Sequence, residues 1–253
     1  MKVMAFSDIH GSVEAIEEAV GYIKDREDIE SIIIAGDFAS INYDSRKNDA
    51  VFYEEEKIRK IFHLIEKIGV KYYFVWGNRD SFFFMDLPPH YMSPKNTGIK
   101  FLESLNLKNG KCLHQYKWLP ISEKFRITTD PKFVDDRTIY VTHWQKGIQT
   151  NALLHLEGHV HYGQVKDNYV NLCFLFRDSL HGAESLLGGI WEIDVNYENL
   201  NIEFIDLGNN VREIICPNHR EEGVFYIPKY WRKCPVCYDI TNAKFLFSVS
   251  TSG

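Results

Sequence analysis

Acidic, amide and imidazole side chains in this sequence follow short apolar segments, and their donor atoms are of the kinds that hold metal ions. The residues are Asp8, His10, Asp37, Asn78, His143, His159 and His161. Hard oxygen donors mixed with borderline nitrogen donors suit Mn²⁺, Fe or Zn²⁺ better than Ca²⁺, which prefers oxygen ligands. A single Asp or His in a loop is usually solvated or caps a helix, so the prediction of a metal centre depends on the whole set.

The segments that precede these residues have the patterns of alternating strands and helices. Residues 2–6, 31–35 and 70–76 form apolar runs, and the second lacks the polar alternation of a strand with one solvated face. Apolar residues recur at spacings of three and four over about 13–23 and 48–68, which predicts two helices. The order β-α-β-α-β favours parallel strands with helices packed on the sheet. Sites in such sheets form at the carboxyl ends of the strands, so we expect the ligands to meet at one edge.

Glycines and a serine mark the ends of these elements. Gly36, Gly77 and Gly158 each stand before a predicted ligand, which indicates that the backbone turns sharply there to aim side chains at a common point. Ser12 is placed to cap the first helix, and Gly69 to end the second.

Shorter strands are predicted beyond residue 100. Asn109-Gly110 is typical of a hairpin turn, and residues 138–142 predict a strand that ends at His143. Further strands are predicted at residues 153–157, 169–176 and 191–195.

The order of the motifs resembles that of the calcineurin-like metallophosphoesterases, in which Asp-x-His, Gly-Asp, Gly-Asn-(His)-Asp/Glu, His and Gly-His-x-His follow one another. The corresponding segments here are Asp8-Ile9-His10, Gly36-Asp37, Gly77-Asn78-Arg79-Asp80, His143 and Gly158-His159-Val160-His161. The resemblance covers roughly residues 1–200, and the ordered set is far more specific than any one motif. It implies an α/β fold of two packed mixed sheets flanked by helices, an α/β/β/α sandwich, and a metal-dependent phosphoesterase activity.

Carried over position by position, the resemblance implies a dinuclear centre. One ion would be held by Asp8, His10, Asp37 and His161, and the other by Asp37, Asn78, His143 and His159, so that Asp37 bridges the pair. The ions would be two divalent cations of Mn, Fe, Ni or Zn. A hydroxide bridging them would attack a phosphodiester or a phosphomonoester.

Arg79 departs from the family pattern, which often has a histidine between the asparagine and the acidic residue. That histidine can help to protonate the leaving group, whereas an arginine stays protonated. The planar guanidinium suits phosphate oxygens, so Arg79 is a predicted substrate-binding residue, with a surface ion pair as the alternative. Asp80 is expected to orient His10 or the metal cluster, as ligating imidazoles commonly require. The predicted catalytic residues are Asn78, Arg79, Asp80 and His143.

A second group of metal-ligating residues lies near the C-terminus. Cys216-Pro-Asn-His219 and Cys234-Pro-Val-Cys237 form two knuckles fourteen residues apart, and the pair resembles a zinc ribbon. Three thiolates and one imidazole would close a tetrahedral structural zinc site, with buried thiols or a disulfide as the alternative. We therefore expect a catalytic domain over residues 1–209 and a zinc-ribbon-like module with a C-terminal tail over residues 210–253.

The net charge of −6 gives no overall attraction to nucleic acid, which is possible as a partner but not favoured. Basic and aromatic residues interleave in the predicted module, yet nearby glutamates cancel much of that charge. We expect the module to pack against the catalytic domain, a protein partner or a second copy. The chain has no apolar run of about eighteen residues and no signal-peptide pattern, so we expect a cytoplasmic protein with no membrane partner.

Two other functions fit the same motifs. A nuclease would bind oligonucleotides with strong salt dependence, because phosphate contacts release counterions. A non-catalytic scaffold of this fold would show no turnover, although here every ligand position has a competent side chain.

Overall fold

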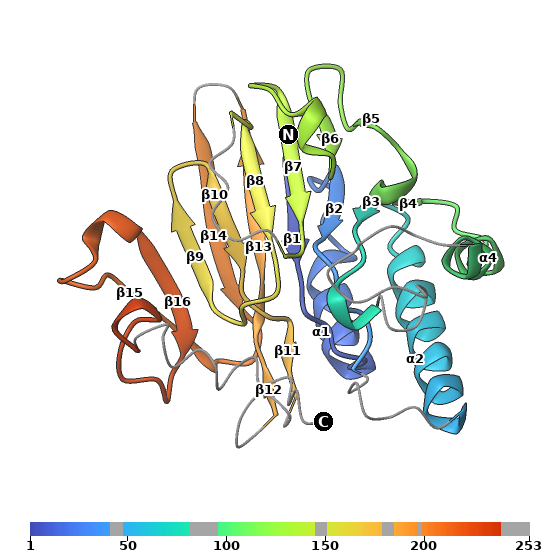
Figure 1. The fold of residues 1–253 in the computed structure, drawn as a ribbon, viewed down its shortest axis with the longest axis horizontal. Coiled ribbons are helices and arrows are strands. Elements are labelled where there is room, and N and C mark those ends of the chain that lie inside the picture. Colours follow the sequence, from blue (N-terminus) through green and yellow to red (C-terminus); the bar gives the residue numbers. More distant parts are fainter. Residues whose placement is uncertain (41–47, 81–95, 145–150, 179–184, 197–198, 239–253) are drawn as a thin grey trace, which may run out of the picture.

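The computed structural model describes residues 1–40, 48–80, 96–144, 151–178, 185–196 and 199–238. Two mixed β-sheets pack together through a shared apolar layer, and the helices of the described part lie against the outer face of the first sheet (Figure 1). This arrangement confirms the predicted α/β fold of two packed mixed sheets with helices.

The first sheet has six strands in the order β14-β13-β1-β2-β3-β4. They are β1 (Lys2–Phe6), β2 (Ser31–Ile34), β3 (Lys71–Phe74), β4 (Gly110–Cys112), β13 (Gly189–Val195) and β14 (Leu200–Asp206). β1 to β4 are parallel to one another, whereas β13 and β14 pair in antiparallel fashion. The β-α-β-α-β prediction for the first third of the chain is therefore confirmed.

The second sheet has eight strands in the order β15-β16-β9-β10-β8-β7-β6-β5. They are β5 (Leu119–Pro120), β6 (Arg126–Thr128), β7 (Thr138–Thr142), β8 (Leu154–Glu157), β9 (Gly163–Lys166), β10 (Tyr169–Leu172), β15 (Val211–Ile214) and β16 (Val224–Pro228). β11 (Phe176–Arg177) and β12 (Leu186–Leu187) form a separate antiparallel pair.

Side chains of the first sheet alternate between two apolar cores. Val3, Ala5 and Ile33 pack between the sheets, while Met4 and Ile32 pack among the helices. The helices that contribute to this second core are α1 (Val13–Ile23), α2 (Asn48–Glu66) and α4 (Asn96–Leu105). Burial on both faces explains why the strand sequences lack polar alternation.

The helix ends follow the predicted signals. The side chain of Ser12 accepts a hydrogen bond from the backbone N–H of Ala15 at 3.2 Å. Gly69, three residues after the end of α2, has a φ of 77°, a left-handed conformation that glycine adopts without strain.

The predicted hairpin at Asn109-Gly110 is wrong. α4 precedes β4, and β4 runs parallel to β3. The carboxylate of Glu66 accepts the backbone N–H groups of Asn109 and Gly110 at 3.1 and 3.2 Å, which fixes the start of β4 beside the end of α2. A Cβ on Gly110 would lie 2.3 Å from the ring of Tyr72, so the glycine is required by close packing and not by a turn.

The predicted strand over residues 169–176 is interrupted. Cys173 has a φ of 66°, a left-handed conformation that ends β10 before β11 begins. The interruption turns the chain toward β1, where Leu175 and Phe176 donate backbone hydrogen bonds to the carbonyls of Ser7 and Asp8.

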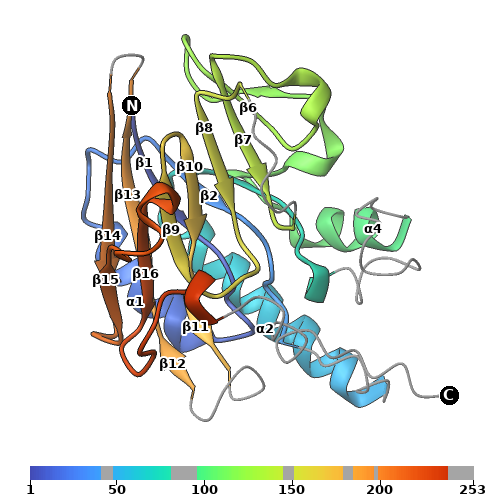
Figure 2. The ribbon, with the colours of Figure 1, turned by 60° about the vertical axis from the view of Figure 1, so that its left-hand side comes forward.

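Two strands of the C-terminal segment extend the second sheet. β16 pairs with β9, and β15 pairs with β16, so both strands of the predicted module continue the eight-stranded sheet (Figure 2). The boundary between residues 209 and 210 stays a prediction. None of the helices in the described part of the chain has both the length and the apolar character that crossing a bilayer requires.

Trp191 joins the two sheets, and its replacement by alanine should destabilise the fold strongly. Its indole N–H donates to the Leu172 carbonyl at 2.9 Å, and its ring packs against Phe204 and Tyr226. We expect Trp191→Ala to lower the free energy of unfolding by about 3–5 kcal/mol in urea titrations. Trp118 is 45% exposed, and Trp118→Ala should cost less than about 1 kcal/mol. Equal losses in the two variants would contradict this assignment.

Candidate dinuclear metal centre

All seven predicted ligands meet at the common carboxyl edge of the two sheets. They follow β1, β2 and β3 in the first sheet and β7 and β8 in the second. Backbone hydrogen bonds tie the loops together: Asp8 donates to Gly36, and His10 donates to Asp37, each at 3.0 Å. His159 donates its backbone N–H to the Asp8 carboxylate at 2.9 Å, which links the two sheets at this edge.

Asp8, His10 and His161 form the first group of ligand atoms, and all three are buried. The Nε2 atom of His161 lies 3.1 Å from Asp8 Oδ1 and 3.0 Å from Nε2 of His10. Ligands about 2.1 Å from one cation at right angles lie about 3 Å apart, so these separations fit a shared ion.

Asp37, His143 and His159 form the second group, and Asn78 adds an oxygen to it. Asn78 Oδ1 lies 2.9 Å from His143 Nε2 and 2.8 Å from His159 Nδ1. Asp37 Oδ2 lies 3.2 Å from the same His143 nitrogen. These separations also fit ligands around one cation.

The orientation of His143 is fixed by its other ring nitrogen. Nδ1 lies 2.6 Å from the Ala35 carbonyl, which can only accept, so Nδ1 carries the proton that is donated. In the neutral ring Nε2 then has the free lone pair that a metal ion needs. Burial lowers the pKa of His143, but the charge of Asp37 outweighs it and raises that pKa to about 10. The Asp37 carboxylate thus favours positive charge between the two groups, which a divalent cation would supply.

The ligands themselves adopt strained backbone conformations. The left-handed φ values are 55° at Asp8, 47° at His10, 55° at Asp37, 80° at His159 and 54° at His161. Such conformations disfavour residues with a Cβ and concentrate at functional sites. The sharp turns at this edge are therefore made largely by the ligand residues.

The three glycines before the ligands have different roles from those predicted. Only Gly36 has a positive φ, of 90°. A Cβ on Gly77 would lie 2.0 Å from Asp37 Oδ1, and one on Gly158 would lie 2.1 Å from Ser7 Oγ. At Gly77 and Gly158 the requirement is close approach of neighbouring loops.

Asp80 holds the loops that carry the ligands. Its buried carboxylate accepts the backbone N–H of Ala39 at 2.8 Å and that of Gly77 at 2.7 Å. Burial and the charge of Asp37 raise the pKa of Asp80 to about 7. These contacts place Asp80 between the loops after β2 and β3, so it supports Asp37 and Asn78 through the backbone.

Arg79 lies between Asn78 and Asp80 at the edge of the centre and is half-buried. Its backbone N–H donates to Asp37 Oδ1 at 2.8 Å, which holds that carboxylate in place. The role of its guanidinium in binding phosphate stays a prediction.

Trp144 follows His143 and lies at the surface beside the centre. Its side chain is 42% exposed, and its ring centre lies 4.9 Å from that of His159. Trp76, by contrast, is fully buried among Phe38, Phe62 and Phe74. Because Trp144 directly follows a ligand, its position in the sequence could have indicated a surface beside the centre.

The C-terminal cysteines and histidine converge as predicted from their spacing. His219 Nδ1 lies 3.5, 3.5 and 3.4 Å from the sulfurs of Cys216, Cys234 and Cys237. The sulfurs of Cys216 and Cys237 are 3.6 Å apart, far longer than the about 2.05 Å of a disulfide. Ligands about 2.1–2.3 Å from a tetrahedral ion lie roughly 3.5–3.8 Å apart, so the cluster fits zinc.

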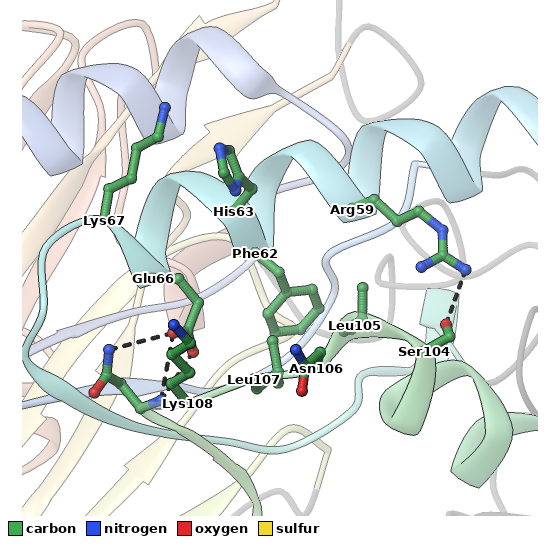
Figure 3. Close-up of a pocket in the computed structure, with 11 residues that line it drawn as sticks. Arg59, Phe62, His63, Glu66, Lys67, Ser104, Leu105, Asn106, Leu107 and Lys108 are labelled. Atoms are coloured by element: carbon green, nitrogen blue, oxygen red, sulfur yellow. Dashed lines mark hydrogen bonds between the residues drawn. The ribbon is translucent and has the colours of Figure 1, made fainter.

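A pocket of about 440 Å³ is formed by the C-terminal half of α2, the last residues of α4 and the segment between α4 and β4 (Figure 3). None of the seven predicted ligands is among its lining residues. Its central carboxylate, Glu66, already accepts hydrogen bonds from Tyr72, Asn109 and Gly110. The chemistry of the ligand edge is thus separate from this pocket.

Comparison with known proteins agrees with the geometry. The model of the calcineurin-like phosphoesterase family matches residues 1–174, which include all seven ligands. The solved structure of a dimetal phosphatase from Danio rerio is 12% identical, with a TM-score of 0.52, over 82% of this chain and 96% of that one. A second solved structure is 13% identical, with a TM-score of 0.52, over 80% of this chain and 98% of that one.

These two structures are similar to the present chain in fold alone, because their identities are low. No curated protein sequence matches the chain. The family match covers more than half of the sequence, and the fold and the clustered ligand atoms agree with it. The chain belongs to the calcineurin-like phosphoesterase family, whose members are metal-dependent hydrolases of phosphate esters.

Proposed function

We propose that this protein hydrolyses a phosphodiester or a phosphomonoester at a dinuclear centre bridged by Asp37. The observation that carries the proposal is the convergence of Asp8/His10/His161 and Asp37/His143/His159 into two adjacent groups. Two divalent cations, of Mn, Fe, Ni or Zn, would supply an activated hydroxide and neutralise charge on the phosphoryl oxygens.

The protein's own contribution is to hold these ligands in fixed, largely buried positions. Backbone hydrogen bonds, the Asp80 carboxylate and the Ala35 carbonyl hold the loops that carry the ligands. Such preorganisation keeps the charges aimed at the reacting group without rearrangement during the reaction. Catalytic roles for Asn78, Arg79, Asp80 and His143 are part of the proposal.

Arg79 and Trp144 support a preference for esters with good leaving groups. Arg79 occupies the family's histidine position, and a guanidinium does not donate a proton to a leaving oxygen. Trp144 offers an exposed ring beside His159, and an aryl or base-like leaving group could stack on it.

We also propose that Cys216, His219, Cys234 and Cys237 hold one structural zinc. The support is the set of 3.4–3.6 Å separations among their donor atoms. The site would be closed by four protein ligands, which is typical of a structural site.

Removal of the catalytic ions should abolish hydrolysis of bis-p-nitrophenyl phosphate and p-nitrophenyl phosphate. Adding back Mn²⁺, Ni²⁺, Fe²⁺ or Zn²⁺ should restore it in the wild type. Asp37→Asn and His143→Ala should remain at least about 1000-fold slower, because each disrupts the shared metal centre. His63→Ala, an exposed change on α2, is the matched control and should keep full activity.

The outcome of this experiment also separates the alternatives. Metal-independent turnover, or full activity in Asp37→Asn, would contradict the proposed centre. Binding of no divalent ion would favour a scaffold. Diester preference with salt-dependent oligonucleotide binding would favour a nuclease.

Rates on a series of aryl phosphate esters should rise steeply as the pKa of the leaving group falls. Arg79→His should flatten this dependence and speed the poorest leaving groups by about 10- to 100-fold, because a histidine can donate a proton. Arg79→Gln is the matched control, since it also removes the guanidinium but supplies no group that can donate a proton to the leaving oxygen. Wild-type rates that do not change with leaving-group pKa would count against the proposal.

The purified protein should contain one zinc per chain that survives mild chelation. Cys234→Ser should lose it because the tetrahedral ligand set is broken. Cys112→Ser removes a buried free cysteine outside this cluster and should keep the zinc. Elemental analysis by mass spectrometry checks both, and equal zinc contents in the two variants would refute the assignment.

A further inference from the structure

We propose that the zinc cluster of Cys216, His219, Cys234 and Cys237 selectively positions the Asp8/His10/His161 half of the catalytic centre. The other half is held mainly through Asp37, Asn78 and His143, whose loops are positioned independently of the cluster. The inference rests on the proposed function and extends it, since it assigns positioning residues to one of the two metal sites.

The first connection runs through the strand that follows His161. β9 begins at Gly163, two residues after that ligand, and it pairs with β16 of the C-terminal segment (Figure 2). Gly163 faces Tyr226, and a Cβ on the glycine would lie 2.8 Å from the Tyr226 Cβ. The backbone just beyond His161 therefore packs directly against β16.

Tyr162 strengthens this connection. It directly follows His161, and its ring centre lies 6.2 Å from that of Phe225 in an edge-to-face arrangement. Both rings belong to the apolar cluster that contains Cys216 and Cys234. The residue next to the ligand thus packs into the same small core as the zinc-binding thiols.

The second connection runs through Arg177 to Asp8. Arg177 is 4% exposed and lies 5.8 and 5.7 Å from the ring centres of Tyr230 and Trp231. It also donates a hydrogen bond to the Tyr230 hydroxyl. Trp231 precedes Cys234 by three residues and packs in the same cluster as that thiol.

The residue before Arg177 contacts a catalytic ligand directly. Phe176 donates its backbone N–H to the Asp8 carbonyl at 3.0 Å. The strand pair β11 and β12 thus carries the packing of Arg177 on Tyr230 and Trp231 to the loop that holds Asp8.

Three ligands of the other half, Asp37, Asn78 and His143, are set farther from the cluster by the topology. His143 follows β7, which is separated from β16 by β9, β10 and β8. Asp37 and Asn78 follow β2 and β3 of the other sheet, where Asp80 holds their loops. The C-terminal segment therefore contacts the surroundings of two ligands of one site, Asp8 and His161.

Loss of zinc should make the C-terminal segment less rigid, so that it positions Asp8 and His161 less well. The cluster's core is small, with only Cys216, Phe225, Ile227 and Cys234 fully buried among the described residues, so it depends on the bound ion for rigidity. Outer contacts that orient metal ligands commonly change metal affinity by about 10- to 100-fold. An effect of this size is expected at the Asp8/His10/His161 site alone.

The test measures the affinity of the full chain for Mn²⁺ by calorimetry. Electron paramagnetic resonance then shows whether the bound ions are exchange-coupled. Wild-type protein should bind two ions with an exchange-coupled spectrum. Cys237→Ser should bind one ion with unchanged affinity and an uncoupled spectrum, and the second about 10- to 100-fold more weakly. Adding His161→Ala to Cys237→Ser should leave the tight site unchanged, whereas adding Asn78→Ala should weaken it.

A second variant keeps the inference testable if Cys237→Ser does not fold. Trp231→Ala leaves all four zinc ligands in place and should retain zinc, yet it should weaken the same Mn²⁺ site. Trp231→Phe should restore most of the affinity, and Trp118→Ala should leave both sites unchanged. Two coupled ions of wild-type affinity in Cys237→Ser and Trp231→Ala would overturn the inference. Failure of the wild type itself to bind a coupled pair would instead overturn the proposed dinuclear centre.

Discussion

Two carboxylates and four imidazoles lie within one largely buried edge between two sheets, where water cannot solvate their charges. Burying such groups is unfavourable unless opposite charge and directed donors compensate. Close contacts of Asp37 with His143 and of Asp8 with His10 and His161 provide part of that compensation. Divalent cations would compensate the buried carboxylate charges more completely. The arrangement therefore favours positive charge at two adjacent points.

The rest of the fold serves to bring these groups together against their repulsion. Parallel strands β1, β2 and β3 deliver Asp8, Asp37 and Asn78 to one edge, and β7 and β8 deliver the histidines from the facing sheet. The apolar layer between the sheets supplies the driving force for this convergence, and Trp191 spans it. Left-handed backbone at five ligands indicates that some local stability is given up for the site.

The C-terminal segment likewise brings metal-ligating residues together in a buried core, but a smaller one. Its cysteines and histidine gather in a core too small to be stable alone, and its strands join the catalytic sheet through β9. The predicted module is therefore continuous with the sheet that carries His159 and His161. Packing of Tyr162 and Arg177 on this segment ties its order to that of the catalytic edge.

The sequence by itself determined the strand and helix order of the first third, the seven ligand candidates and the spacing of the zinc knuckles. These are local or ordered patterns: apolar periodicity specifies an element, and a ligand at a strand end specifies an edge. The tertiary structure alone decided that Asn109-Gly110 begins a parallel strand, because Glu66 and Tyr72, distant in sequence, fix it there. It likewise decided that Asp80 supports backbone, that Trp144 is exposed beside His159, and that Arg177 packs on Tyr230 and Trp231. Those roles depend on contacts between segments far apart in the chain, which no local pattern encodes.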